Sequence, residues 1–179
     1  HADVLVDFTT PQTAGANAIM AAMAGVRPVV GTTGIPQHEL DKLSEICFEK
    51  GLAAAIIPNF SYGAMLMAEF CELALQYFQD VEIIEKHHKT KLDSPSGTAR
   101  RLAQRLEQLA GSNEIPVHSL RLPGFVAHHE VVFGGLGETL TIKHDTISRD
   151  SFAPGVLMVV RKIERLRGMY YDLHQVLKA

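Results

Sequence analysis

The sequence predicts an α/β fold, in which a parallel sheet with helical crossovers is followed by an α+β domain with a mixed sheet. Two patterns support this: short apolar segments alternate with helical ones in the first half, whereas residues 128–134 and 138–145 form two alternating runs joined by a glycine-rich turn. The composition is that of a globular protein, with 46% apolar and 21% charged residues and a net charge of −3. Neither charge nor apolar runs suggest a nucleic acid or a membrane as partner.

Strands and helices alternate along the first part of the chain. The predicted elements are strands at residues 4–8, 28–31 and 53–57 and helices at residues 13–23, 37–50 and from about residue 62. The strand at 28–31 lacks polar alternation, which fits a sheet covered on both faces. The loops that follow these strands lie at their carboxyl ends, where open α/β sheets bind ligands.

The loop from Gly31 to Gly34 is a candidate nucleotide contact. Its two glycines allow a ligand to approach the backbone closely, and Thr32 and Thr33 offer hydroxyl and N–H groups to phosphate or ribose. Taken alone the pattern is weak, because a two-glycine turn between a strand and a helix is commonplace. A purely structural turn is therefore the alternative.

A second domain with a mixed sheet is predicted after this region. Its expected elements are strands at residues 80–85 and 117–121, a helix at 100–109, the hairpin of residues 128–134 and 138–145, and a helix at 151–166. The hairpin carries His128, His129, Glu130 and His144. We expect these side chains to be solvated or to form cross-strand polar pairs rather than to bind a metal.

The segment 85–99 carries the strongest functional pattern, because it connects a predicted strand to a predicted helix. Ser94 or Ser96 can cap that helix, so that free backbone N–H groups and the positive end of the helix dipole are available to a carboxylate or phosphate. Lys91 adds a fixed positive charge beside this helix start. The combination predicts a site for a small acidic molecule.

His87 and His88 are the candidate acid–base and ligand residues of this segment. Neighbouring residues of a strand point to opposite faces, so we expect one histidine to supply a proton and the other to hold a carboxylate. A plain surface pair and a metal site are the alternatives. No metal is predicted, since the segment lacks a nearby cysteine and a helical H-x-x-x-H spacing, and its lysines oppose a dication.

The same segment resembles the dihydrodipicolinate reductase family. It matches almost completely that family's signature, E-x-H-H-x-x-K-x-D-[AS]-P-S-G-T-A. Further similar segments follow in the expected order along the chain, at residues 6–11, 29–34, 58–63, 121–124, 148–156 and 168–173. The resemblance therefore spans essentially the whole chain and is more specific than any single motif.

The resemblance implies a fold, a reaction and an assembly. The fold is a partial Rossmann-type parallel sheet in residues 1–78, a substrate-binding and oligomerisation domain in 79–166, and a segment, 167–179, that returns to the nucleotide domain. The implied reaction is reduction of 4-hydroxy-tetrahydrodipicolinate or dihydrodipicolinate to tetrahydrodipicolinate by NADPH or NADH, in the diaminopimelate route of lysine biosynthesis. The implied assembly is a homotetramer formed through the second domain's sheet.

The resemblance also implies roles for individual residues. His87 would donate a proton and act with Lys91 in catalysis. The substrate would be bound by His88, Lys91, Ser96, Gly97 and Thr98. The cofactor would be bound by Phe8, Gly31, Thr32, Thr33, Pro58, Asn59, Phe60, Arg149 and Phe152.

Two departures from the family pattern stand out. The G-x-G-x-x-G turn and the first βα units are missing, so we expect the sequence to be a piece of a longer protein, and the segment at residues 110–116 is shorter than in relatives. A non-catalytic dicarboxylate-binding module or remnant is the alternative, and another two-domain oxidoreductase acting on a sugar or aldehyde is a third. Cys47 and Cys71 lie among apolar residues, and without a signal-peptide pattern they indicate buried, reduced thiols in a cytoplasmic protein.

Overall fold

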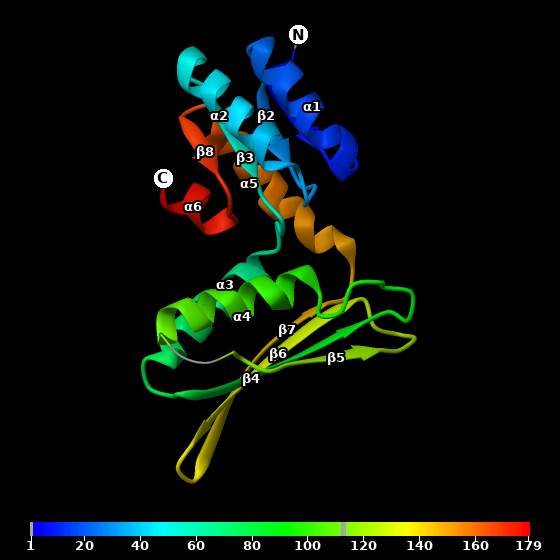
Figure 1. The fold of residues 1–179 in the computed structure, drawn as a ribbon, viewed down its shortest axis with the longest axis vertical. Helices are drawn as coiled ribbons and strands as arrows, with labels where there is room; N and C mark the ends of the chain where they lie inside the picture. The colour runs from blue at the N-terminus through cyan, green and yellow to red at the C-terminus, as the bar shows by residue number, and fades with distance from the viewer. Residues whose placement is uncertain (1, 112–113) are drawn as a thin grey trace. The chain divides into compact units, whose positions relative to one another are not determined.

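The computed structural model describes residues 2–111 and 114–179, which form two compact units (Figure 1). The first unit contains the residues through Tyr62 together with Phe152–Ala179, and the second contains Gly63–Ser151. The departure expected at residues 110–116 includes 112 and 113, which lie outside the described residues. Within the described ranges, every helix is too short or too polar to cross a bilayer.

A four-stranded parallel sheet forms the centre of the first unit. Its strands run in the order β1 (Val4–Asp7), β2 (Arg27–Val30), β3 (Ala53–Ile56) and β8 (Gly168–Tyr170). Its helices are α1 (Pro11–Met23), α2 (Gln37–Lys50), α5 (Ala153–Ile163) and α6 (Leu173–Lys178). The parallel sheet with helical crossovers is as predicted, and β8 returns the end of the chain to it.

Small and β-branched side chains allow both faces of this sheet to be covered. Val30 and Ala54 pack with Leu43 and the alanines of α1 in one core cluster. Val29 is also fully buried but points to the opposite face, where α5 contacts β2 and β3. A run of apolar residues without polar alternation is thus explained by burial on both sides.

Helix α5 approaches the chain at Phe60 so closely that only glycine fits at residue 155. A Cβ atom placed there would lie 2.0 Å from the carbonyl oxygen of Phe60. Pro154 occupies the first turn of α5, a position at which proline's missing N–H removes no helical hydrogen bond. The Pro-Gly pair therefore fits the start of this helix rather than interrupting it.

A mixed four-stranded sheet with two helices on one face forms the second unit (Figure 1). Its strands are β4 (Asp80–His87), β5 (Val117–Arg121), β6 (Ala127–Gly135) and β7 (Glu138–Thr146), in the order β5-β4-β6-β7. Strand β4 is parallel to β5 and antiparallel to β6, which is antiparallel to β7. The helices are α3 (Tyr62–Leu75) and α4 (Gly97–Ala110), and a 3-10 turn, η1, spans Arg149–Phe152.

The compact units divide the chain after residues 62 and 151, whereas the sequence placed the boundaries at 78 and 166. Helix α3 belongs to the second unit because Met67 and Cys71 pack against Ile83 and the other apolar residues of the mixed sheet. Helix α5 belongs to the first unit because it covers the parallel sheet. Both cysteines are buried and free, as predicted.

Candidate active site

Strand β4 places Glu85 and His87 on the face of the mixed sheet that α3 and α4 cover. Alternate residues of the strand share this face, and Ile83, Glu85 and His87 are all buried. The strand ends at His87, and the next residue, His88, is exposed and lies within 2.8 Å of the Thr90 hydroxyl through Nδ1. The two histidines therefore have different surroundings, because the strand ends between them, and their separate roles stay a prediction.

The Glu85 carboxylate lies at the centre of a hydrogen-bond network. It accepts hydrogen bonds from Arg121 Nη1 at 2.9 Å and Nη2 at 2.6 Å, and from the backbone N–H of Ser96 at 3.1 Å; it also contacts His87 Nδ1. Burial alone would raise the pKa of Glu85, but the hydrogen bonds, with Arg121 foremost, outweigh it and lower the pKa to about 2. Glu85 is therefore an ionised carboxylate at neutral pH.

His87 is buried beside this carboxylate. Burial lowers the pKa of His87, and Glu85 opposes that effect by stabilising the protonated ring. An ionised carboxylate accepts hydrogen bonds only, so Nδ1 of His87 carries the hydrogen of their contact. Nε2 is then the ring nitrogen that can exchange a proton with a ligand.

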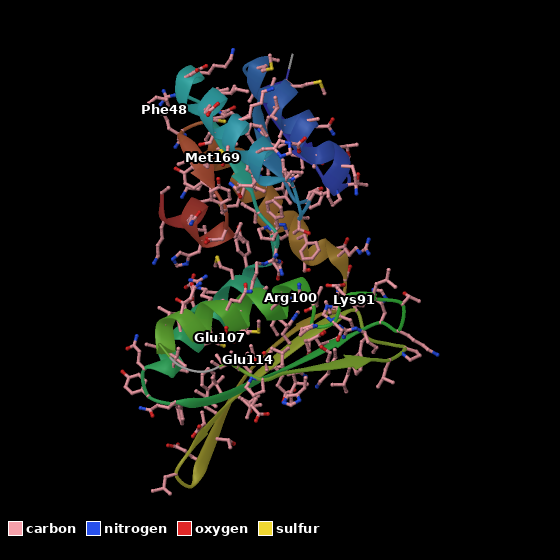
Figure 2. All side chains as sticks on the ribbon, in the orientation of Figure 1. Phe48, Lys91, Arg100, Glu107, Glu114 and Met169 are labelled. Atoms are coloured by element: carbon pink, nitrogen blue, oxygen red, sulfur yellow. The ribbon has the colours of Figure 1, made fainter. Side chains whose placement is uncertain are left out.

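The start of helix α4 holds a carboxylate. Ser96 caps the helix, with its Oγ accepting from the N–H of Ala99 at 3.3 Å. The N–H of Gly97 donates to Asp93 Oδ2 at 3.2 Å, and Lys91 Nζ lies 2.7 Å from Asp93 Oδ1. Figure 2 labels Lys91 in the segment before α4. The carboxylate at this helix start is that of Asp93 itself, so the binding of an acidic ligand there stays a prediction.

His129 differs from the expectation of a solvated or paired residue. It is 4% exposed, its Nε2 lies 3.3 Å from Ser96 Oγ, and its ring meets that of His87 edge to face with 5.4 Å between centroids. Burial, followed by the nearby His87, lowers the pKa of His129 to about 4, so the ring is neutral at pH 7. His128 does form a cross-strand pair, with Asp145 at 2.7 Å.

Three predicted cofactor residues of the first unit contact one another. The Phe8 and Phe60 rings lie 5.6 Å apart, and a Cβ at Gly31 would lie 2.0 Å from Cε1 of Phe8. Next to them, Thr32 Oγ1 is buried and has no hydrogen-bond partner among residues 2–111 and 114–179. The Phe8 ring fills the space beside Gly31, so the support for a bound polar group such as a nucleotide is the buried Thr32 hydroxyl without a partner in these ranges.

The remaining predicted residues have less defined surroundings. Asn59 Oδ1 accepts a hydrogen bond from the N–H of Ser61 at 2.9 Å, while Thr33 is exposed and Pro58 is half-buried. Thr98 lies in the first turn of α4. Arg149 and Phe152 are the first and last residues of η1, and the boundary between the compact units falls between them.

Sequence reasoning missed Glu85, Arg121 and His129 as parts of the site. Glu85 could have been found, because a charged residue at i−2 from His87 interrupts the apolar face of β4. The roles of Arg121 and His129 depend on strand pairing: Arg121 lies opposite His87 in register, and His129 lies opposite Glu85. Nothing local in the sequence specifies these two contacts.

Comparison with known proteins identifies the family of the chain. The family description "Dihydrodipicolinate reductase, N-terminus" matches residues 1–60, and "Dihydrodipicolinate reductase, C-terminus" matches residues 63–177. The chain is 52% identical over 180 residues to a 4-hydroxy-tetrahydrodipicolinate reductase from Symbiobacterium thermophilum, covering 98% of the chain and 70% of that protein. It is 46% identical to the protein of the same name from Geobacillus kaustophilus, covering 98% of the chain and 74% of that protein.

A solved structure also matches. It is that of a dipicolinate-bound dihydrodipicolinate reductase from Paenisporosarcina sp. TG-14, with a TM-score of 0.88 and 37% identity over 97% of this chain and 73% of that one. The fold and these matches define the class first: the chain is an α/β reductase with a dinucleotide-binding type of parallel sheet and a mixed-sheet unit. Within that class, it belongs to the dihydrodipicolinate reductase family.

Proposed function

We propose that the chain reduces 4-hydroxy-tetrahydrodipicolinate to tetrahydrodipicolinate with NADPH or NADH, in the diaminopimelate route of lysine biosynthesis, and that groups within residues 87–98 hold the substrate. The observation that carries the proposal is the carboxylate site at the start of α4, beside a buried histidine that is bound to a carboxylate. The names of the relatives and the dipicolinate bound in the Paenisporosarcina enzyme support the same substrate class.

The substrate carboxylates are bound by N–H groups and positive charge. Gly97 and Thr98 offer backbone N–H groups at the helix start, and Lys91 and His88 hold the other charged end of the ring. The carboxylate of Asp93 now contacts both Lys91 and Gly97, so one substrate carboxylate replaces it at Gly97 and the other at Lys91 when the substrate binds. Ser96 already uses its N–H and hydroxyl within the protein, and its part is to cap the helix.

The cofactor supplies the hydride, and the protein positions the cofactor. The loops after β1, β2 and β3 provide Phe8, Gly31, Thr32, Thr33, Pro58, Asn59 and Phe60 for this purpose, with Arg149 and Phe152 as further contacts. Thr32 is the best supported of these residues, because its buried hydroxyl needs a partner.

His87 is the proton donor in the proposed reaction. Loss of the 4-hydroxyl as water gives a dihydrodipicolinate-type ring. Hydride transfer then adds an electron pair to that ring, and the atom that becomes electron-rich must be protonated. Nε2 of His87 donates that proton. Burial lowers the pKa of His87 in the free chain, and the negative charge of the bound substrate carboxylates raises it again. The neutral ring left behind keeps its hydrogen on Nδ1, against Glu85.

Replacement of the two histidines separates their roles. His87→Gln should lower kcat by about a hundredfold or more with a small change in KM, because a missing general acid affects the chemical step. His88→Gln serves as the matched variant and should mainly raise KM, as should Lys91→Met with an additional loss of kcat. An unchanged kcat in His87→Gln would remove His87 from the acid role.

The assembly and compartment are part of the proposal. A homotetramer formed through the mixed sheet is supported by exposed apolar side chains of α3, the turn after it and β7, namely Phe70, Leu73, Tyr77 and Leu140. A cytoplasmic location is supported by two buried free thiols. Light scattering of the purified protein tests the assembly, and a monomeric mass would contradict it.

A further inference from the structure

We propose that Glu85 and Arg121 form a positioning pair that fixes the tautomer of His87 and sets how strongly this ring holds its working proton. The proposal rests on the proposed function, in that His87 is its proton donor. Neither Glu85 nor Arg121 reaches the ligand in this account; both act through His87.

Glu85 selects the tautomer by geometry. Its Oε2 meets Nδ1 of His87, and it accepts further hydrogen bonds from Arg121 and from the backbone N–H of Ser96. Together with the Ser119 hydroxyl, these contacts keep Glu85 ionised at neutral pH. The carboxylate therefore has no hydrogen to give, and Nδ1 must be the donor. With Nδ1 protonated in both charge states, Nε2 is the one atom at which the ring can gain or lose a proton.

Arg121 keeps Glu85 in place and ionised. Its two terminal nitrogens both bind the carboxylate, and they also donate to the carbonyl oxygens of Leu120 at 2.8 Å and Asp93 at 2.9 Å. Three of these four hydrogen bonds join β5 to β4 and to the loop before α4, and the bond to Leu120 lies within β5. The carboxylate cannot turn away from His87 without breaking this fork-like pairing.

The ring of His87 is also restrained on its other side. The neutral ring of His129, from β6, packs against it edge to face, and is itself within hydrogen-bond distance of Ser96. Ser96 in turn donates its backbone N–H to Glu85. The network closes on itself, so that Glu85, His87 and His129 are fixed by a single set of contacts.

The charges near His87 act in opposite directions on its proton. The negative charge of Glu85, from β4, favours the imidazolium, whereas the positive charges of Arg121, from β5, and Lys91, from the loop, oppose it. Asp93 is paired with Lys91, and His129 from β6 is neutral. Removal of Glu85 and removal of Arg121 should therefore shift the titration of His87 in opposite directions, which a purely structural pair would not do.

The test is a histidine titration by nitrogen-15 NMR of the full chain, with the His87 signals assigned from His87→Gln. We expect wild-type His87 to carry its hydrogen on Nδ1. Glu85→Gln should lower the titration midpoint of His87 by about one pH unit, and Arg121→Met should raise it by a similar amount. The alkaline fall in kcat should move in the same directions in the two variants.

The design includes two further variants. Glu82→Gln changes an exposed carboxylate on the other face of β4 and should leave both the tautomer and the midpoint as in wild type. The double variant Glu85→Gln, Arg121→Met removes both charges, so neither charge is left buried without its partner. It therefore keeps the test valid if a single variant misfolds. The titration midpoint of His87 in the double variant should fall between the midpoints of the two single variants.

Midpoints that move in the same direction, or a wild-type ring with its hydrogen on Nε2, would overturn the proposal. The titration needs no turnover. An unchanged kcat in His87→Gln would therefore count against the proposed function alone, while the NMR result would decide the positioning pair.

Discussion

Acid should destabilise the protein through Glu85, because this carboxylate is buried and ionised in the folded state. The pKa of Glu85 is about 2 in the fold against 4.5 for the free group. Its contribution to stability is therefore complete above about pH 4.5 and is lost as the pH falls towards 2. At about 1.4 kcal/mol per pKa unit the full contribution is about 3 kcal/mol, of which about 2 kcal/mol is lost by pH 3.

Urea unfolding at neutral pH and at about pH 3 measures this loss. The double variant Glu85→Gln, Arg121→Met lacks the group and should lose about 2 kcal/mol less than wild type on the same acidification. Glu82→Gln should lose as much as wild type, because the Glu82 side chain is 60% exposed and exposed ion pairs add little stability. An equal loss in wild type and the double variant would refute the assignment of a strongly lowered pKa to Glu85.

Two further predictions concern the packing inside each compact unit. Gly155→Ala should lower the free energy of unfolding by about 1–3 kcal/mol, because the added Cβ would meet the Phe60 carbonyl. Gly134→Ala is the control and should change this free energy little, because the nearest atom to its Cβ would be 3.8 Å away. Equal effects of the two variants in urea unfolding would contradict this prediction. Burial raises the pKa of the Cys47 thiol to about 11 and that of the Cys71 thiol to about 12. Iodoacetamide at about pH 8 should therefore alkylate both cysteines far more slowly in the folded than in the unfolded protein. Equal alkylation rates in the two states would count against their burial.

The sequence predicts elements well where a local pattern determines them. The helix predicted at residues 37–50 is α2 as observed, and the hairpin expected around residues 135–137 is formed by β6 and β7. The segment 85–99 contains a strand end and a capped helix start, as its residue types indicate. Lys91 pairs with Asp93, and its contact with an acidic ligand stays a prediction. Periodicity and capping act over a few residues, so one sequence is enough to reveal them.

Tertiary contacts explain what the sequence did not predict. Helix α3 is apolar on more than one side, and only its packing under the mixed sheet assigns it to the second unit. His129 is buried because it lies opposite Glu85 and beside His87, although a histidine in a polar hairpin is more often exposed. Arg121 lies 36 residues from Glu85 along the chain, so their ion pair follows from strand register alone.

Hydride transfer is the most direct test of the central claim. The purified chain is mixed with NADPH or NADH and freshly generated 4-hydroxy-tetrahydrodipicolinate, and loss of the reduced nicotinamide absorbance is followed, with pyridine-2,6-dicarboxylate binding measured on the same sample. We predict oxidation that requires the substrate and falls by about a hundredfold in His87→Gln. Dicarboxylate binding without any oxidation would contradict the account and would make the chain a dicarboxylate-binding module.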